Sequence, residues 1–144
     1  MQVREIMHST TVLNGRLSVQ FAAGIMRDKN IGSILVEGEK GKVAGIVTER
    51  DVLKKVVAGG LDPRSTTLNE IMSAKLVTIR EDADISEASS LLGKFQIRRL
   101  PVVNSKGEII GIATARDVAK SIGYSQVQKI SGEYGRVGFF ENRT

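Results

Sequence analysis

Residues 45–52 read GIVTERDV, and residues 111–118 read GIATARDV. A shift of 66 positions that superimposes these two stretches also aligns residues 19–54 with residues 85–120 without a gap, and 12 of the 36 positions are identical. An internal repeat of this length indicates one supersecondary unit that is used twice in the chain.

Each copy shows the same order of hydrophobic patterns. Short alternating or continuous apolar segments predict strands, and Gly-containing polar stretches between two of them predict a hairpin. The predicted strands span residues 11–13, 33–37 and 43–47 in the first copy, and 77–79, 100–104 and 109–113 in the second. A helix is predicted after the first strand, and a second helix is predicted to start at Thr48 or Thr114. The unit is therefore β-α-β-β-α.

The first helix of each copy is predicted from apolar residues at helical spacing. These residues are Val19, Ala22, Ala23 and Met26 in the first copy, and Ile85, Ala88, Leu92 and Phe95 in the second. Ser18 and Asp84 stand where N-caps belong, and Asp84 with Glu87 resembles a capping box. We expect both helices to turn their apolar residues toward the sheet of their own copy.

The domain organisation follows from the size of the unit. A unit of about 55 residues buries too little surface to be stable alone, so we expect the two copies to pack against each other. We predict a mixed α/β (α+β) fold with a first domain at 1–58, a linker at 59–67, a second domain at 68–122 and a tail at 123–144. Four of the six aromatic residues lie in the tail, and we expect Tyr134, Phe139 and Phe140 to be buried against a module.

Composition excludes several classes of protein. The 144 residues contain no cysteine and a single histidine, His8, so we expect no disulfide, no catalytic thiolate and no metal site. No apolar run reaches the roughly 20 residues of a membrane-spanning helix. The N-terminal residues lack the apolar core of a signal peptide, and the expected location is the cytoplasm. The net charge of +5 fits an anionic ligand without identifying it.

The repeated motifs resemble those of tandem CBS-domain proteins, also called Bateman modules. The resemblance covers residues 3–122. It rests on the Glu-Ile-Met runs that end at Met7 and Met72, on residues 97–103 (IRRLPVV), and on the two Gly-x-x-Thr-x-Arg-Asp runs. It implies two repeats related by pseudo-twofold symmetry, with clefts between them.

The resemblance also implies a ligand and the residues that hold it. The expected ligands are AMP, ADP, ATP or S-adenosylmethionine. The first strand of each copy would hold the adenine, the aspartate the ribose hydroxyls, and the threonine and nearby arginines the phosphates. The residues assigned in this way are Val12, Thr48, Asp51, Val77, Ile97, Arg98, Arg99, Pro101, Thr114 and Asp117.

Each assignment has a structural alternative. Thr-x-x-Asp at a helix start is also close to a capping box, which needs no ligand. Arg98 and Arg99 could be a charged strand entrance, and Arg50 and Arg116 are expected to face solvent or an acidic side chain. We expect His8 to be a surface residue.

The first copy departs from the pattern, because it has Gly-Ser-Ile-Leu at 32–35 where the second has Arg-Arg-Leu-Pro. We therefore expect unequal ligand occupancy, with the tighter nucleotide site served by Arg98 and Arg99.

The sequence thus predicts a non-catalytic regulatory module that senses an adenine nucleotide and acts on a separate, unidentified effector protein. No nucleophile–base pair can be built from these residues, so we expect no enzyme and no catalytic cofactor. The alternatives are a structural dimerisation module without a ligand and a nucleic-acid-binding accessory protein; the latter lacks a recognition signature. We also predict a homodimer, because apolar helix positions such as Val52, Val56, Val118 and Ile122 exceed what one small module needs to bury, and we expect some of them to face a second subunit.

Overall fold

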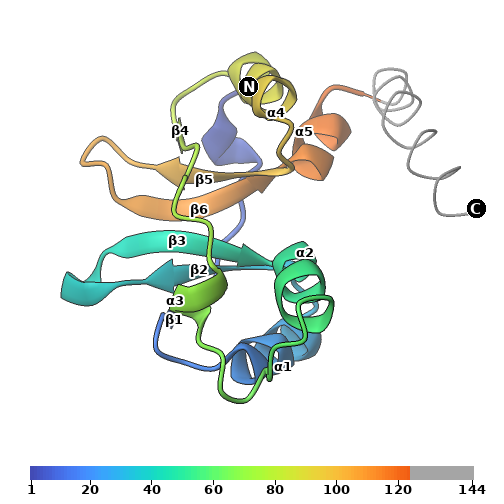
Figure 1. Cartoon of the computed structure of the whole chain (residues 1–144). Coiled ribbons are helices and arrows are strands. Elements are labelled where there is room, and N and C mark those ends of the chain that lie inside the picture. The colour runs from blue at the N-terminus through green and yellow to red at the C-terminus, as the bar shows by residue number, and fades with distance from the viewer. Residues whose placement is uncertain (124–144) are drawn as a thin grey trace, which may run out of the picture. The chain divides into compact units, whose positions relative to one another are not determined.

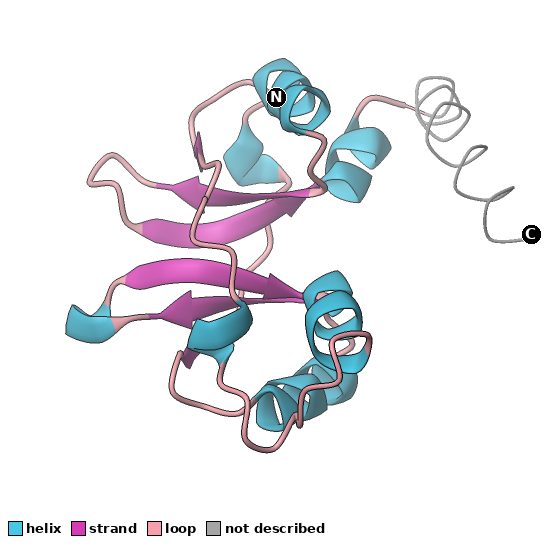
Figure 2. Ribbon diagram, in the orientation of Figure 1, coloured by secondary structure: helices cyan, strands magenta, loops and turns pink. Residues whose placement is uncertain are grey.

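The computed structural model describes residues 1–123, and the chain divides into two compact units. The repeat-1 unit is Ser9–Leu76, and the repeat-2 unit combines Met1–His8 with the chain from Val77 onward. Each unit contains one three-stranded sheet and its own helices (Figures 1 and 2). The predicted burial of Tyr134, Phe139 and Phe140 lies outside the described residues.

The repeat-1 unit is built on a mixed sheet. Its elements are β1 (Val12–Asn14), α1 (Val19–Lys29), β2 (Ser33–Glu37), the 3₁₀ turn η2 (Glu39–Gly41), β3 (Val43–Thr48), α2 (Glu49–Asp51), the π-helix η3 (Val52–Val57) and α3 (Leu68–Ile71). The strand order is β1-β2-β3, with β1 parallel and β3 antiparallel to β2. The helix α1 supplies the crossover that a parallel strand pair requires.

The repeat-2 unit reproduces this arrangement. Its elements are the 3₁₀ turn η1 (Val3–Glu5), β4 (Ile79–Arg80), α4 (Ile85–Phe95), β5 (Arg99–Val103), β6 (Ile109–Thr114) and α5 (Ala115–Ser121). The strand order is β4-β5-β6 with the same directions. Even the β-bulge recurs, at 36/37 and at 102/103, which are 66 positions apart. The predicted α+β fold with two β-α-β-β-α repeats is confirmed, whereas their pseudo-twofold packing stays a prediction.

The predicted helix starts are confirmed by their caps. Ser18 accepts a hydrogen bond from the backbone N–H of Phe21 at 3.1 Å. Asp84 caps α4 differently from the prediction, because it accepts from the N–H of Ser86 at 3.0 Å, while Glu87 donates its N–H to the Asp84 carbonyl. Each cap satisfies a backbone donor that the helix itself leaves unpaired.

Each unit has its own apolar core. The helix residues that were predicted from spacing are buried or half-buried, with one exception. Phe95 is 47% exposed, so its predicted place on the apolar face of α4 is wrong. It is the last residue of α4, directly before Gln96 in the left-handed conformation, and the Lys94 ammonium lies 5.4 Å from its ring centroid. Phe95 therefore lies at the C-terminal end of α4, where about half of its side chain stays exposed.

The segments that lead into each repeat pack in the opposite unit. Residues 1–8 precede the first repeat in sequence, but Val3 N–H donates to the Ala83 carbonyl, and His8 exchanges two 2.9 Å hydrogen bonds with Ile112 of β6. In the repeat-1 unit, Ser73 makes the same exchange with Ile46 of β3. Each unit therefore contains the segment that precedes the other repeat in the sequence.

Glycine in the repeated Gly-Ile pair allows this backbone contact. A Cβ at Gly45 would lie 2.7 Å from the Ser73 carbonyl oxygen, and a Cβ at Gly111 would lie 2.7 Å from that of His8. No side chain fits at that distance from a backbone atom that is itself held by hydrogen bonds. This explains physically why both copies of the motif begin with glycine.

Four apolar side chains at the second helices differ in how deeply they are buried. Val56 and Val118 are buried in the cores of their own units, and Val52 and Ile122 are half-buried against those cores. Val56 and Val118 are thus used inside their own units, and a contact of Val52 or Ile122 with a second subunit stays a prediction. The exposed apolar residues of this region are instead Leu53 and Val57, which lie on η3.

Candidate functional site

Thr48 and Asp51 form a reciprocal cap at the start of α2. Asp51 Oδ2 accepts from the Thr48 backbone N–H at 2.8 Å and from its hydroxyl at 3.1 Å, and Thr48 Oγ1 accepts from the Asp51 N–H at 3.2 Å. The capping box that was weighed as the alternative to ligand contact is therefore present. One carboxylate oxygen is fully used by the cap, and the other, Oδ1, points away from it.

Thr114 and Asp117 repeat this geometry at the start of α5. Asp117 Oδ2 accepts from the Thr114 N–H at 3.0 Å and from its hydroxyl at 2.7 Å, and the Asp117 N–H donates to Thr114 Oγ1 at 3.1 Å. Burial raises the pKa of Asp117, but hydrogen bonds from Thr114 and His8 outweigh it and hold the pKa below its ordinary value. Asp117 is therefore a carboxylate at neutral pH.

The remaining oxygen of each aspartate meets a different cation-forming side chain. Asp51 Oδ1 lies 3.4 Å from the Lys55 ammonium, one helical turn further along. Asp117 Oδ1 lies 2.7 Å from the Nε2 of His8, which is 109 positions away in sequence. The prediction that His8 is a surface residue is confirmed, since its side chain is 64% exposed, but it also contacts a predicted ligand residue.

Both partners of the aspartates are positioned by the leading segments. Lys55 Nζ also donates to the Ile71 carbonyl at 2.7 Å, at the end of α3. His8 is held by its two backbone hydrogen bonds to Ile112. Sequence analysis missed both residues, although the shared spacing of Asp51 and Lys55 on one helix face could have indicated the first. His8 could not have been found without the tertiary structure.

The basic pair lies beside the second cap. The Arg98 carbonyl accepts from the Ala115 N–H at 2.8 Å, and Arg99 is paired with Thr114 across β5 and β6. Arg98 is exposed and Arg99 half-buried. In the repeat-1 unit the same backbone bond runs from the Glu49 N–H to the Gly32 carbonyl at 3.1 Å, with no basic side chain at that position. The structure therefore brings Arg98, Arg99, Thr114 and Asp117 to one end of the sheet.

The apolar residues assigned to the ligand differ in exposure. Val12 on β1 is exposed, Val77 and Ile97 are half-buried against the repeat-2 core, and Pro101 is buried within β5. Pro101 has a backbone consequence, because its counterpart Leu35 donates its N–H to the Thr11 carbonyl at 3.0 Å. Proline cannot donate, so Val77, the counterpart of Thr11, receives no such bond.

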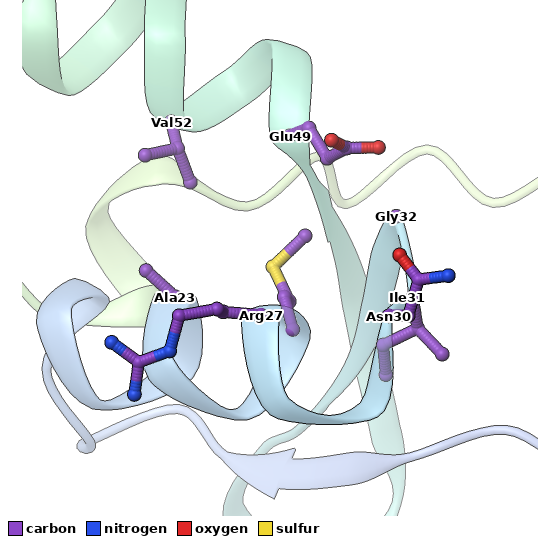
Figure 3. Close-up of a pocket in the computed structure, with 8 residues that line it drawn as sticks. Ala23, Arg27, Asn30, Ile31, Gly32, Glu49 and Val52 are labelled. Atoms are coloured by element: carbon purple, nitrogen blue, oxygen red, sulfur yellow. The ribbon is translucent and has the colours of Figure 1, made fainter.

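Neither of the two best-defined cavities contains a predicted ligand residue. A cavity of about 360 Å³ in the repeat-1 unit lies beside α1 and the start of α2, and Met26, Arg27 and Glu49 are among the residues that line it (Figure 3). One of about 390 Å³ in the repeat-2 unit is lined by residues of α4 and α5. The capped aspartates therefore lie outside both cavities.

Two further features concern only residues 1–123. No helix in this range is long and apolar enough to cross a membrane. No group of three or more His, Asp or Glu side chains in this range could hold a metal ion, and the sequence has no cysteine.

Comparison with known proteins defines the family. The family model for the CBS domain matches residues 3–58 and 68–124, and the chain belongs to this family as a tandem pair of CBS domains.

Among relatives, hypoxic response protein 1 of Mycobacterium tuberculosis is 31% identical over 120 residues, which is 83% of each chain. An uncharacterised protein of Methanopyrus kandleri is 42% identical over 93 residues, and the match spans 65% of this chain but only about half (47%) of that relative.

Solved structures of CBS pairs share the fold. The CBS domain pair of protein MJ0100, in complex with methylthioadenosine and S-adenosyl-L-methionine, is 27% identical with a TM-score of 0.75, and covers 85% of this chain and 100% of its own. Hypoxic response protein 1, solved with two coordinated zinc ions, is 30% identical with a TM-score of 0.72, and covers 83% of this chain and 98% of its own.

Proposed function

We propose that this chain is a non-catalytic regulatory module that binds an adenosyl ligand (AMP, ADP, ATP or S-adenosylmethionine) at Asp51 and Asp117 and passes that state to a separate effector protein. One observation carries the proposal: in both repeats an aspartate has one oxygen, Oδ2, fixed by a threonine cap, while its other oxygen, Oδ1, takes no part in the cap. The bound adenosyl compounds of the MJ0100 pair support the choice of ligand class.

The chemistry of the carboxylate supports ribose binding. An ionised carboxylate offers about four acceptor positions, and the threonine N–H and hydroxyl occupy the two on Oδ2. Oδ1 keeps its acceptor capacity apart from the contact with Lys55 or His8. The cap thus holds the carboxylate in one rotamer and leaves acceptor capacity for a ribose hydroxyl.

The ligand at the second repeat is proposed to carry phosphate. Arg98 and Arg99 lie beside Thr114, at the start of α5. Arginine recognises phosphate by charge-assisted hydrogen bonds. The carbonyl of Val77, which Pro101 cannot bind, is the proposed acceptor for the adenine amino group. The first repeat lacks the arginines and the proline, and we propose that it binds a nucleotide more weakly.

A thermal-shift panel tests the proposal. The wild type and the variants Asp51→Asn, Asp117→Asn and the double variant are heated with AMP, ADP, ATP or S-adenosylmethionine. A ligand at 100 times its Kd stabilises by about 2.7 kcal/mol, which raises Tm by roughly 5–11 °C for a chain of this size. We expect the shift to shrink in each single variant and to vanish in the double variant.

Asp82→Asn is the matched control, because Asp82 is an exposed aspartate that pairs with Arg80 at 3.1 Å away from both caps. Its ligand response should equal that of the wild type. If no adenosyl ligand raises the Tm of the wild type or of any variant, the aspartates act as helix caps alone and the chain is a structural module. The effector, the homodimer and the cytoplasmic location stay predictions within this proposal.

A further inference from the structure

Asp117 is approached from outside its own helix by the only histidine in the chain. His8 Nε2 lies 2.7 Å from Asp117 Oδ1, the oxygen that the threonine cap leaves available. The His8 backbone is fixed by two hydrogen bonds to Ile112, so the imidazole is held at this oxygen by the fold rather than by chance rotation. The His8 side chain is 64% exposed, whereas the Asp117 side chain is 14% exposed, so the imidazole covers this oxygen from the solvent side.

The repeat-1 unit fills the corresponding position with a different residue. Lys55 approaches Asp51 Oδ1 from the helix, whereas the residue equivalent to His8 is Ser73. In the repeat-2 unit the residue equivalent to Lys55 is Ser121, whose hydroxyl donates to the Val118 carbonyl at 2.6 Å. In each unit a nitrogen donor thus lies at the aspartate Oδ1, and this donor is an ammonium group in the first repeat and an imidazole in the second.

We infer that His8 is a ligand-selecting residue of the second site, which competes with the ribose hydroxyls for Asp117 Oδ1. This inference rests on the proposed adenosyl function. With His8 in place, Oδ1 keeps acceptor capacity for one hydroxyl, and accepting both ribose hydroxyls requires the imidazole to move away. The imidazole is harder to displace when it is protonated, because it then forms an ion pair with the carboxylate.

Other charged residues lie on the elements that contact the His8 segment. On α5 these are Arg116 and Asp117, whose pKa is held below its ordinary value. Arg98 and Arg99 begin the neighbouring β5 and remain cationic. Within its own segment, Arg4 pairs with Glu81 at 3.5 Å, and Glu5 accepts from the Gln2 N–H at 2.6 Å. Imidazole is the side chain whose charge ordinarily changes between about pH 5 and 8, so a pH response of ribose binding that disappears in His8 variants would be assigned to this side chain.

Calorimetry with adenosine tests the inference, because adenosine has the ribose but no phosphate and no charge in this range. Asp51→Asn isolates the second site, and Asp117→Asn isolates the first. We expect the affinity of the second site to fall about threefold to fivefold from about pH 8 to about pH 5.5, the size expected for an exposed ion pair. The first site, with Lys55, should show no such change.

Substitutions of His8 in the Asp51→Asn background separate competition from direct ligand contact. His8→Gln keeps a neutral donor and should remove the pH response. His8→Lys should keep the low affinity at both pH values, as in the first repeat. His8→Ala should bind adenosine at about pH 5.5 at least as tightly as the unsubstituted background does at about pH 8. A loss of affinity in His8→Ala at both pH values would overturn the competition.

The NMR signals of the single imidazole give a second measurement that does not depend on affinity. The His8 ring resonances should move when adenosine saturates the second site, and should move less in Asp117→Asn. If adenosine binds but these signals stay in place and the affinity is independent of pH, the inference fails while the proposed function stands. If adenosine and the nucleotides bind at neither aspartate, both fail together.

Discussion

The two repeats keep the same caps and differ in what surrounds them. Both hold an aspartate by a threonine at the start of a helix, with hydrogen-bond lengths that agree within about 0.4 Å. The groups beside the aspartate differ. Its Oδ1 contacts Lys55 in the first repeat and His8 in the second. Gly32 and Leu35 of the first repeat stand where the second has Arg98 and Pro101. The caps, which the two repeats share, stabilise the helix starts. The side chains that differ are those that the proposed ligand would contact.

The second helix shows the same division of roles. In the first repeat, the chain continues after α2 as the π-helix η3, and Ala58 N–H donates to the carbonyl five residues back at Leu53. In the second repeat, α5 is a regular α-helix. Val56 of η3 and Val118 of α5 are nonetheless both buried in their cores. The second helix is therefore a π-helix in one repeat and an α-helix in the other, and in both repeats it places a valine in the core.

The largest expected effect concerns the arginines at the second site. A charged hydrogen bond to phosphate contributes about 1.5–3 kcal/mol, so Arg99→Ala should weaken AMP or ATP binding by about tenfold to a hundredfold. Asp117→Ala should likewise remove most of the high-affinity binding, whereas Asp51→Ala should remove less. Calorimetry on these three variants measures the difference. Two equal sites in the wild type would contradict the asymmetry between the repeats.

The next largest effect is expected at the glycine of the repeated motif. Gly111→Ala places a Cβ about 2.7 Å from the His8 carbonyl oxygen and should reduce the free energy of unfolding by about 1–3 kcal/mol. Gly45→Ala should act similarly through Ser73. Urea denaturation gives both values. Gly93→Ala is the matched control, since nothing lies within 4 Å of its added Cβ and alanine favours the helix. Equal stabilities of Gly93→Ala and Gly111→Ala would contradict the structure.

A smaller effect is expected on the free energy of unfolding when Asp117 is protonated at low pH. Its folded-state pKa is lowered, so its contribution is complete above the ordinary carboxyl pKa and is lost as the pH falls through the folded value. Asp117→Asn should therefore cost about 1 kcal/mol at about pH 6, and this cost should shrink below about pH 4. Denaturant unfolding at both pH values measures it. A cost that is constant across this range would show that the carboxylate charge does not stabilise the cap.

The smallest expected effect concerns exposed apolar residues of the first repeat. Leu53 and Val57 are 61% and 67% exposed on η3. Leu53→Lys should change stability by less than about 0.5 kcal/mol, because the side chain has little to lose from the core. If the predicted homodimer uses this helix, the same substitution should produce monomers in sedimentation. A dimer that is unchanged in Leu53→Lys and Val57→Lys would place the subunit contact elsewhere.

Most of the fold could be predicted from the sequence because each strand and helix of the repeat occurs twice, so that the pattern in one copy supports the prediction in the other. The strand 33–37 was predicted with its observed bounds, and the remaining strands differ by one or two residues at their ends. The threonine caps were predicted because Thr-x-x-Asp is a local pattern whose partners lie three residues apart. Phe95 was misplaced, since helical spacing does not reveal that α4 ends there.

The sequence by itself determined the duplication, the order of the elements and the two threonine–aspartate caps, because each depends on residues close together in the chain. Only the tertiary structure decided that residues 1–8 pack in the repeat-2 unit and that His8 meets Asp117 across 109 positions. It also decided which side chains of the second helices are buried. Such contacts depend on how the backbone hydrogen bonds of a sheet edge are completed, and no local pattern encodes the partner that completes them.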